Sequence, residues 1–236
     1  MLIRTVITFT FFLCFCCCSE APKEDQKNIR SDEEINTEKT IPEDTQYESY
    51  EKFILFFGNS LSAGYGLKEG ESFPDRIQER LDSLGYRYKV VNAGVSGETT
   101  ADGAGRINWV LGQDIDIFVL ELGGNDILRG LDINYTEKNL RTIIESVRTK
   151  DPEIKIILAG MQSPPNMGEA YSKALADLYP RLANEYDVGL IPFLLDIVGG
   201  NPEFNQPDAI HPNVEGAKIV ANTVWKTLVS YLEKEN

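Results

Sequence analysis

The sequence predicts an α/β fold, a three-layer doubly wound (flavodoxin-like) domain with a five-stranded parallel sheet. Three observations support this prediction. Short apolar segments alternate with amphipathic segments of about 12 residues from position 53 onward. The apolar segments are continuous, as in strands that are buried on both faces. Strands that alternate with helices in this way form a parallel sheet covered by helices on both sides.

Five segments are expected to form the strands. The first is the apolar run 53–57, which ends at Gly58. The other four are similarly short and apolar, and we place them at residues 89–91, 115–122, 155–159 and 188–191.

The helices are expected between these strands. Ser72 is expected to cap the first, and Gly85 to end it, because apolar residues recur between them at helical spacing: Phe73, Ile77, Leu81 and Leu84. Further helices are expected at about 100–111, 136–150, 169–186 and 214–232. Within the segment 169–186, Pro180 predicts a kink or an interruption.

The chain begins with a segment that indicates export. Arg4 precedes fifteen uncharged residues, 5–19, which are too few for a transmembrane helix of about 20 residues. Residues 1–18 therefore read as a signal peptide, and their final cysteines followed by Ser19 resemble a bacterial lipoprotein signal. We expect Cys18 to be lipidated and to hold the protein at a membrane, in the periplasm or on the cell surface. A plain secretory signal is the alternative.

Residues 19–52 differ in composition from both neighbours. They contain eleven acidic and five basic residues, and their few apolar positions form no stripe. Such a segment cannot bury enough surface to offset the entropy of ordering, so we expect a disordered acidic linker. The folded domain is then expected to span residues 53–236.

Composition also excludes several kinds of partner and site. The net charge of −14 argues against nucleic acid, because phosphate binding needs a basic surface. All four cysteines lie between positions 14 and 18, and His211 is the single histidine, so neither a disulfide framework nor a Cys- or His-based metal site is expected. No cofactor and no protein partner is predicted.

Three clusters of small or polar residues directly follow predicted strands. The first, residues 58–61, places Ser60 at the expected start of a helix, where it is either a nucleophile or an ordinary helix cap. The second, residues 92–97, contains Gly94, whose backbone N–H could face a substrate, although an ordinary glycine turn fits equally well. The third, residues 123–126, contains Asn125, whose amide could bind an oxyanion or form a turn.

The fourth cluster, residues 208–212, precedes the last predicted helix. Asp208 lies three residues before His211, so a bent loop could bring its carboxylate to the imidazole. A local turn with the histidine on the surface is the alternative. Because ligands of doubly wound folds bind beyond the carboxyl ends of the strands, all four clusters are expected on the same side of the sheet.

These four blocks, in this order, resemble the SGNH hydrolase superfamily, which is also known as GDSL-type esterases and lipases. The resemblance covers nearly all of residues 53–232 and is strongest to the bacterial arylesterase, lysophospholipase and thioesterase branch. It implies a serine esterase in which Ser60, His211 and Asp208 form the catalytic triad. It also implies an oxyanion hole made by the Ser60 and Gly94 N–H groups and the Asn125 side chain. Asn59 departs from the family, which usually has Asp at this position.

The expected substrates are small-molecule carboxylic esters with aryl, short-acyl or lysophospholipid character. Thioesters are less expected, because an exported enzyme does not meet cytoplasmic acyl-CoA. Apolar residues after the third and fourth predicted strands could line an acyl pocket or pack against each other: Ile127, Leu128, Leu131, Met161, Pro164, Pro165 and Met167. Two alternative functions remain, a carbohydrate O-deacetylase and a non-catalytic binding lipoprotein that has kept the fold.

Overall fold

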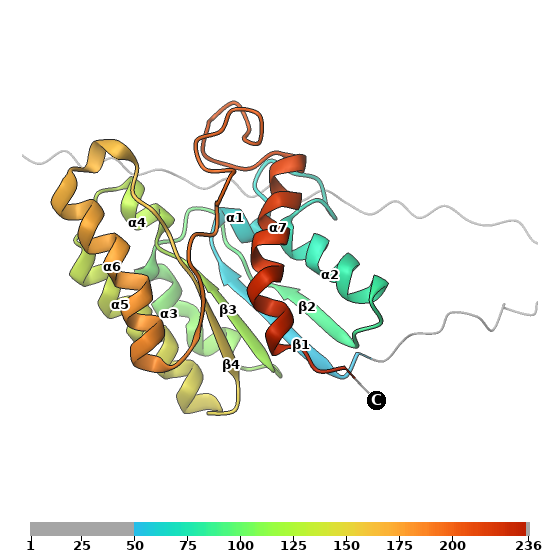
Figure 1. Cartoon of the computed structure of the whole chain (residues 1–236). Coiled ribbons are helices and arrows are strands. Elements are labelled where there is room, and N and C mark those ends of the chain that lie inside the picture. Colours follow the sequence, from blue (N-terminus) through green and yellow to red (C-terminus); the bar gives the residue numbers. More distant parts are fainter. Residues whose placement is uncertain (1–49, 235–236) are drawn as a thin grey trace, which may run out of the picture. The chain divides into compact units, whose positions relative to one another are not determined.

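The computed structural model describes residues 50–234. The predicted signal peptide, Cys18 and nearly all of the predicted linker lie outside these residues. In the described part of the chain, five parallel strands form one sheet in the order β2-β1-β3-β4-β5 (Figure 1). The strands are β1 (Lys52–Gly58), β2 (Tyr88–Asn92), β3 (Ile117–Glu121), β4 (Lys155–Ala159) and β5 (Gly189–Ile191). This is the flavodoxin-like order, which confirms the predicted fold class.

Helices connect the strands and cover both faces of the sheet. They are α1 (Ser60–Ala63), α2 (Phe73–Ser83), α3 (Thr100–Val110), α4 (Gly124–Leu128), α5 (Ile133–Lys150), α6 (Glu169–Tyr186) and α7 (Val214–Leu228), with short 3₁₀ turns η1 (Pro165–Met167) and η2 (Val229–Tyr231). Helices α2 and α7 pack together on one face, whereas α3, α5 and α6 form the layer on the other (Figure 1).

Three predicted helices differ from the observed ones in detail. Helix α7 ends at Leu228 instead of 232, because the chain continues as the 3₁₀ turn η2. Helix α5 begins at Ile133 instead of 136, because Asp132 caps it by accepting a hydrogen bond from the Asn134 N–H at 2.8 Å. Helix α6 continues through Pro180, so the predicted interruption does not occur. Within residues 50–234 no helix is long and apolar enough to cross a membrane.

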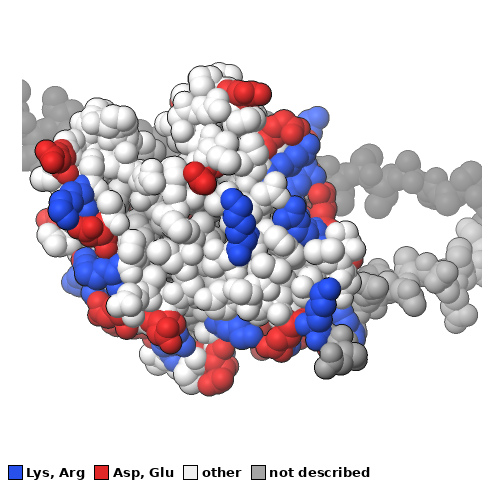
Figure 2. Space-filling model, viewed as in Figure 1, with Lys and Arg blue, Asp and Glu red and all other residues white. Residues whose placement is uncertain are grey.

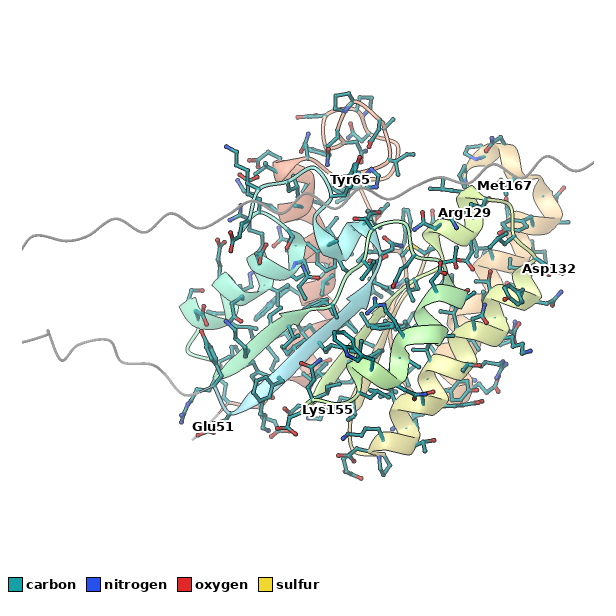
Figure 3. The ribbon with its side chains drawn as sticks, turned by 180° about the vertical axis from the view of Figure 1, so that it is seen from behind. Glu51, Tyr65, Arg129, Asp132, Lys155 and Met167 are labelled. Carbon is teal, nitrogen blue, oxygen red and sulfur yellow. The ribbon has the colours of Figure 1, made fainter. Side chains whose placement is uncertain are left out.

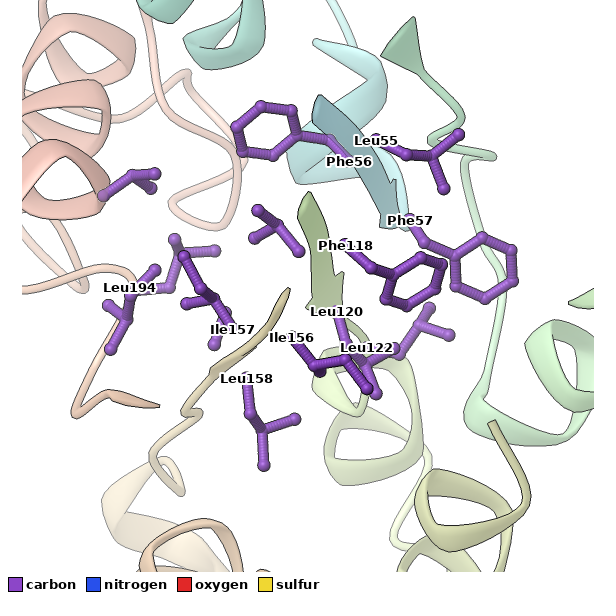
Figure 4. Packing of buried hydrophobic residues seen from close by; sticks show 14 of the residues in the cluster. Leu55, Phe56, Phe57, Phe118, Leu120, Leu122, Ile156, Ile157, Leu158 and Leu194 are labelled. Atoms are coloured by element: carbon purple, nitrogen blue, oxygen red, sulfur yellow. The ribbon is translucent and has the colours of Figure 1, made fainter. Parts of the chain in front are cut away.

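The core lies on both sides of the central strands. Figure 4 shows that Leu55 and Phe57 leave β1 on one side and Phe56 leaves it on the other. All three side chains are fully buried. The ring of Phe56 meets Phe73 of α2 edge-on, with centroids 5.4 Å apart. Burial on both faces explains why the strand segments are uniformly apolar in sequence.

The strands run in the same direction, so their carboxyl ends share one edge of the sheet. The connections that follow β1, β2 and β3 meet there, with the long connection from β5 to α7. Figure 3 shows Tyr65, Arg129 and Met167 at this end of the domain and Glu51 and Lys155 at the other. All the predicted site residues within the described chain lie in the connections at the carboxyl end.

Candidate active site

Ser60 lies at the first position of α1, directly beyond the carboxyl end of β1. Asn59, not Ser60, caps this helix, because the Asn59 Oδ1 accepts a hydrogen bond from the Leu61 N–H at 3.0 Å. The Ser60 hydroxyl is therefore not needed as a helix cap. The side chain is nearly buried, with 8% of the residue exposed.

Ser60, His211 and Asp208 form one continuous chain of polar contacts. The Ser60 Oγ lies 3.0 Å from the His211 Nε2, and the His211 Nδ1 lies 2.6 Å from the Asp208 Oδ2. Both distances are within the range of hydrogen bonds. Residues that are 151 positions apart in the sequence thus meet at hydrogen-bond distance.

The carboxylate of Asp208 is held by its own loop. Its Oδ1 accepts hydrogen bonds from the backbone N–H groups of Ile210 (2.9 Å) and His211 (3.0 Å). These bonds, together with the bond to the imidazole, lower the pKa of Asp208 to about 2. Ala209 adopts a positive φ of 59° in this turn, which lets the chain bend back on itself. Asp208 is therefore an anion throughout the neutral range.

A second carboxyl group contacts residues on both sides of the serine in the sequence. Glu121, the last residue of β3, is fully buried, and its Oε2 accepts hydrogen bonds from the Asn59 N–H (3.0 Å), the Ser62 N–H (3.2 Å) and the Ser62 hydroxyl (2.8 Å). A Cβ on Gly58 would lie 2.3 Å from this oxygen, so the close approach requires glycine. Burial raises the pKa of Glu121 to about 7, although these hydrogen bonds oppose the shift.

The Gly94 N–H is already engaged within the protein. It donates a hydrogen bond to the Asn92 Oδ1 at 3.0 Å, while the Asn92 side chain donates to the Ser62 carbonyl at 2.7 Å. A Cβ on Gly94 would lie 2.4 Å from the Ala63 nitrogen. Gly94 thus lets the connection after β2 approach α1 closely, and a substrate would have to compete with Asn92 for the Gly94 N–H.

The Asn125 side chain lies against the same connection. Its Nδ2 donates one hydrogen bond to the Glu98 carbonyl at 2.7 Å, which leaves the second amide hydrogen for another acceptor. Arg129 donates to the Gly97 carbonyl at 2.9 Å. Gly97 itself has a positive φ of 86° and open space beside its Cα. No described residue accepts a hydrogen bond from the Gly97 N–H.

Arg106 stabilises the connection between β2 and α3, which contains Gly94 and Gly97. This side chain bonds the Glu98 carboxylate (Nη2 to Oε2, 2.7 Å) and the Ala93 carbonyl (2.8 Å). Its guanidinium lies 4.0 Å from the centre of the Phe57 ring. The connection is thus fixed before any ligand binds, as an oxyanion site requires.

Sequence comparisons agree with this geometry. The profile of the GDSL-like Lipase/Acylhydrolase family matches residues 56–219. The chain belongs to this family. It is 38% identical over 176 residues to the thioesterase 1/protease 1/lysophospholipase L1 of Escherichia coli K12, covering 74% of this chain and 82% of that protein. It is 36% identical over 180 residues to the arylesterase of Vibrio mimicus, covering 76% and 89%.

A solved structure shows the same fold. The crystal structure of TesA matches with a TM-score of 0.73 and 36% identity, over 77% of this chain and all of that one. The predictions of the superfamily and of a carboxylic ester hydrolase are thereby confirmed.

The space beside the serine in this GDSL-like hydrolase is narrow. A hollow of about 10 Å³, room for one water molecule, adjoins Ser60 and His211. Of the apolar residues predicted to line a pocket, Ile127 and Met161 are buried in the core, whereas Leu128 is 54% exposed.

Figure 2 shows that charged side chains gather along the lower and lateral edges of the visible face, and that the lobe between β5 and α7 is mostly uncharged.

Two residues near the serine had no assigned role in the sequence analysis. Glu121 was treated as part of an apolar strand, although a lone carboxyl group in such a strand is a signal for a buried polar contact. Gly97 was part of the recognised motif, but its sequence context did not distinguish it from Gly94. Within residues 50–234 no cluster of His, Cys, Asp and Glu side chains could hold a metal ion.

Proposed function

We propose that this enzyme hydrolyses carboxylic esters through an acyl-enzyme on Ser60. His211 acts as the general base, and Asp208 orients the imidazole and stabilises its protonated form. The observation that carries this proposal is the 3.0 Å contact between the Ser60 Oγ and the His211 Nε2. Only one side chain of this enzyme, His211, combines that position with a reference pKa suited to proton transfer near neutrality.

The reaction has two balanced steps. The Ser60 oxygen attacks the ester carbonyl while its proton passes to the His211 Nε2, and collapse of the tetrahedral intermediate expels the alcohol, which takes that proton. Water then attacks the acyl-enzyme and gives a proton to the same nitrogen. The carboxylic acid leaves, and Ser60 recovers its proton.

We propose that the oxyanion is bound by the Ser60 N–H, the free hydrogen of the Asn125 amide and the Gly97 N–H. The Ser60 and Gly97 N–H groups have no acceptor among the described residues. This set replaces the predicted Gly94, because the Gly94 N–H is bonded to Asn92. Each such donor contributes about 2.7–4 kcal/mol of transition-state stabilisation.

We propose that the substrates are aryl esters, short-acyl esters or lysophospholipids. Two relatives support these ester classes, because one is named an arylesterase and the other a thioesterase and lysophospholipase. A series of p-nitrophenyl esters of increasing chain length measures the preference. Release of acetate from acetylated polysaccharide, with little turnover of longer esters, would identify a carbohydrate O-deacetylase instead.

The Ser60→Ala and His211→Ala variants test the mechanism. Each is expected to lower kcat for p-nitrophenyl acetate by at least about 10⁴-fold while the circular dichroism spectrum stays unchanged. A fluorophosphonate probe should label the natural enzyme but not the Ser60→Ala variant. A folded Ser60→Ala variant with full activity would disprove the mechanism, and an unlabelled natural protein would indicate a non-catalytic binding lipoprotein.

We also propose that the chain is exported and anchored at a membrane by a lipid on Cys18. This proposal rests on the uncharged run that ends in cysteines and on Ser19 after them. Radioactive palmitate should label the natural chain in bacterial cells and not the Cys18→Ser variant. Equal labelling of both chains, or of neither, would refute lipidation at Cys18.

A further inference from the structure

An aromatic ring lies directly against the histidine of the triad. Tyr65, two residues beyond α1, places its ring centroid 4.6 Å from that of His211, with the ring planes inclined at 41°. Cations interact with an aromatic face when they lie within about 6 Å of the ring centroid. Tyr65 is 54% exposed, so its position is not explained by burial in the core. Figure 3 shows Tyr65 at the end of the domain where the strands terminate.

The backbone on both sides of Tyr65 is tightly constrained. Gly64 and Gly66 have positive φ angles of 73° and 75°. A Cβ on Gly64 would lie 2.7 Å from the Ser72 Cβ, and one on Gly66 would lie 2.2 Å from the Gln206 Oε1. Both positions therefore require glycine, and the turn that they form determines where the Tyr65 ring lies.

One side chain connects the tyrosine turn with the histidine loop. The Gln206 Nε2 donates hydrogen bonds to the Tyr65 carbonyl (2.7 Å) and to the Pro212 carbonyl (3.0 Å). The Gln206 backbone N–H donates to the His211 carbonyl at 2.7 Å. Gln206 thus holds the backbone of Tyr65 and that of His211 in a fixed relation, which keeps the two rings in contact.

Few groups around the imidazole can balance a positive charge. Among residues 50–234, the side chains in hydrogen-bond or ring contact with it are the Asp208 carboxylate, the Ser60 hydroxyl and the Tyr65 ring. The remaining lining of the adjoining hollow, from α1, α2, α7 and their connections, is uncharged: Leu61, Gly64, Leu67, Phe73, Pro212, Ala217 and Val220. An imidazolium at His211 would therefore contact one carboxylate and one aromatic ring.

We propose that Tyr65 is a further catalytic residue, whose aromatic face stabilises the protonated form of His211, and that Gln206 is a positioning residue that holds the ring in place. This inference rests on the proposed function, because an imidazolium forms only if His211 accepts the Ser60 proton. The aromatic face carries the effect. The hydroxyl group is dispensable, because within residues 50–234 the side chain of Tyr65 contacts His211 through its ring and its hydroxyl makes no hydrogen bond.

The Tyr65→Leu and Tyr65→Phe variants of the full chain test the proposal with p-nitrophenyl acetate as substrate. Loss of the ring should lower kcat about 3- to 30-fold, which corresponds to a cation–π energy of about 0.7–2 kcal/mol. It should also move the acidic limb of the kcat/KM profile to lower pH by roughly half a unit or more, because the protonated histidine is less favoured. Tyr65→Phe should restore both properties to within about twofold.

Matched variants separate this effect from a general disturbance. Tyr135 on α5 is similarly exposed, at 50%, and Tyr135→Leu should change neither kcat nor the pH profile. Gln206→Leu should reproduce part of the change in the pH profile. Gln78 holds β2 through the Tyr88 carbonyl (3.1 Å) and the Val90 N–H (2.7 Å), so Gln78→Leu should lower stability without moving the acidic limb.

Fluorinated phenylalanines at position 65 provide a test that keeps the shape of the side chain. Fluorine withdraws charge from the ring face, so kcat should fall progressively with the number of fluorine atoms. Equal kcat values across the series, or a change in KM alone, would overturn the proposal. Tyr65 would then only line the site without stabilising the imidazolium. Full activity of the Ser60→Ala variant would instead refute the underlying mechanism, so the two failures are distinguishable.

Discussion

Replacing Glu121 by Gln tests how a buried carboxyl group beneath Ser60 affects stability. Glu121 is fully buried, and its pKa is raised from 4.5 to about 7 in the folded protein. Between these two pH values the folded state keeps the proton that the unfolded state has lost. The free energy of unfolding must therefore fall as the pH rises through this window, and it is highest below the unfolded pKa.

The size of the effect follows from the shift. A difference of about 2.5 pKa units corresponds to roughly 3 kcal/mol, because each unit is worth 1.36 kcal/mol. Glutamine cannot ionise, so the Glu121→Gln variant should lack this fall. The amide also alters the bonds to Asn59 and Ser62, but that offset is common to all pH values and cancels when two pH values are compared.

Urea denaturation of both proteins at pH 4 and pH 8 measures this difference. The free energy of unfolding of Glu121→Gln, relative to the natural protein, should rise by about 3 kcal/mol between the two conditions. Glu69→Gln, at an exposed position, should show no such rise and serves as the control. A pH-independent difference between Glu121→Gln and the natural protein would refute the assigned protonation.

Four further substitutions, one of them a control, have specific expected outcomes. Asn125→Ala should lower kcat about 10²- to 10³-fold with little change in KM, and steady-state kinetics will contradict the oxyanion role if kcat is unchanged. Gly94→Ala should lower the free energy of unfolding by about 1–3 kcal/mol, because the added carbon would lie 2.4 Å from the Ala63 nitrogen. The control Gly105→Ala lies in open space on α3 and should raise the melting temperature. Tyr179→Phe removes a buried bond to the Leu122 carbonyl (3.0 Å) and should cost about 1 kcal/mol in urea denaturation with kcat unchanged; a lower kcat would show that Tyr179 also supports the site.

Much of the fold could be predicted because burial leaves a strong pattern in the sequence. The strands β1 and β4 are continuous apolar runs, and α2 has both a capping serine and a regular apolar stripe. The helices α1 and α4 have four and five residues, too few to show any periodicity. A helix was expected to begin at Ser60, but none was predicted at residues 124–128.

The site could be predicted in outline but not in its supporting contacts. Ser60, Asn125 and His211 follow strands or precede a helix at the expected edge of the sheet, and the order of their motifs is characteristic. Whether a given backbone N–H is free depends on distant partners, as the bond from Gly94 to Asn92 shows. The contacts of Glu121 and Gln206 join segments that are far apart in the chain, so local sequence patterns do not reveal them.

The distance in sequence between Ser60 and His211 has a consequence for biosynthesis. The serine emerges early from the ribosome, whereas its partner belongs to the loop before the last helix, so a growing polypeptide lacks a complete set of reacting groups until translation is nearly finished. Appearance of ester turnover during refolding should accordingly coincide with docking of the C-terminal helix α7 against α2. Any C-terminal truncation that removes this helix should leave the serine unreactive, even where the first strands have already paired.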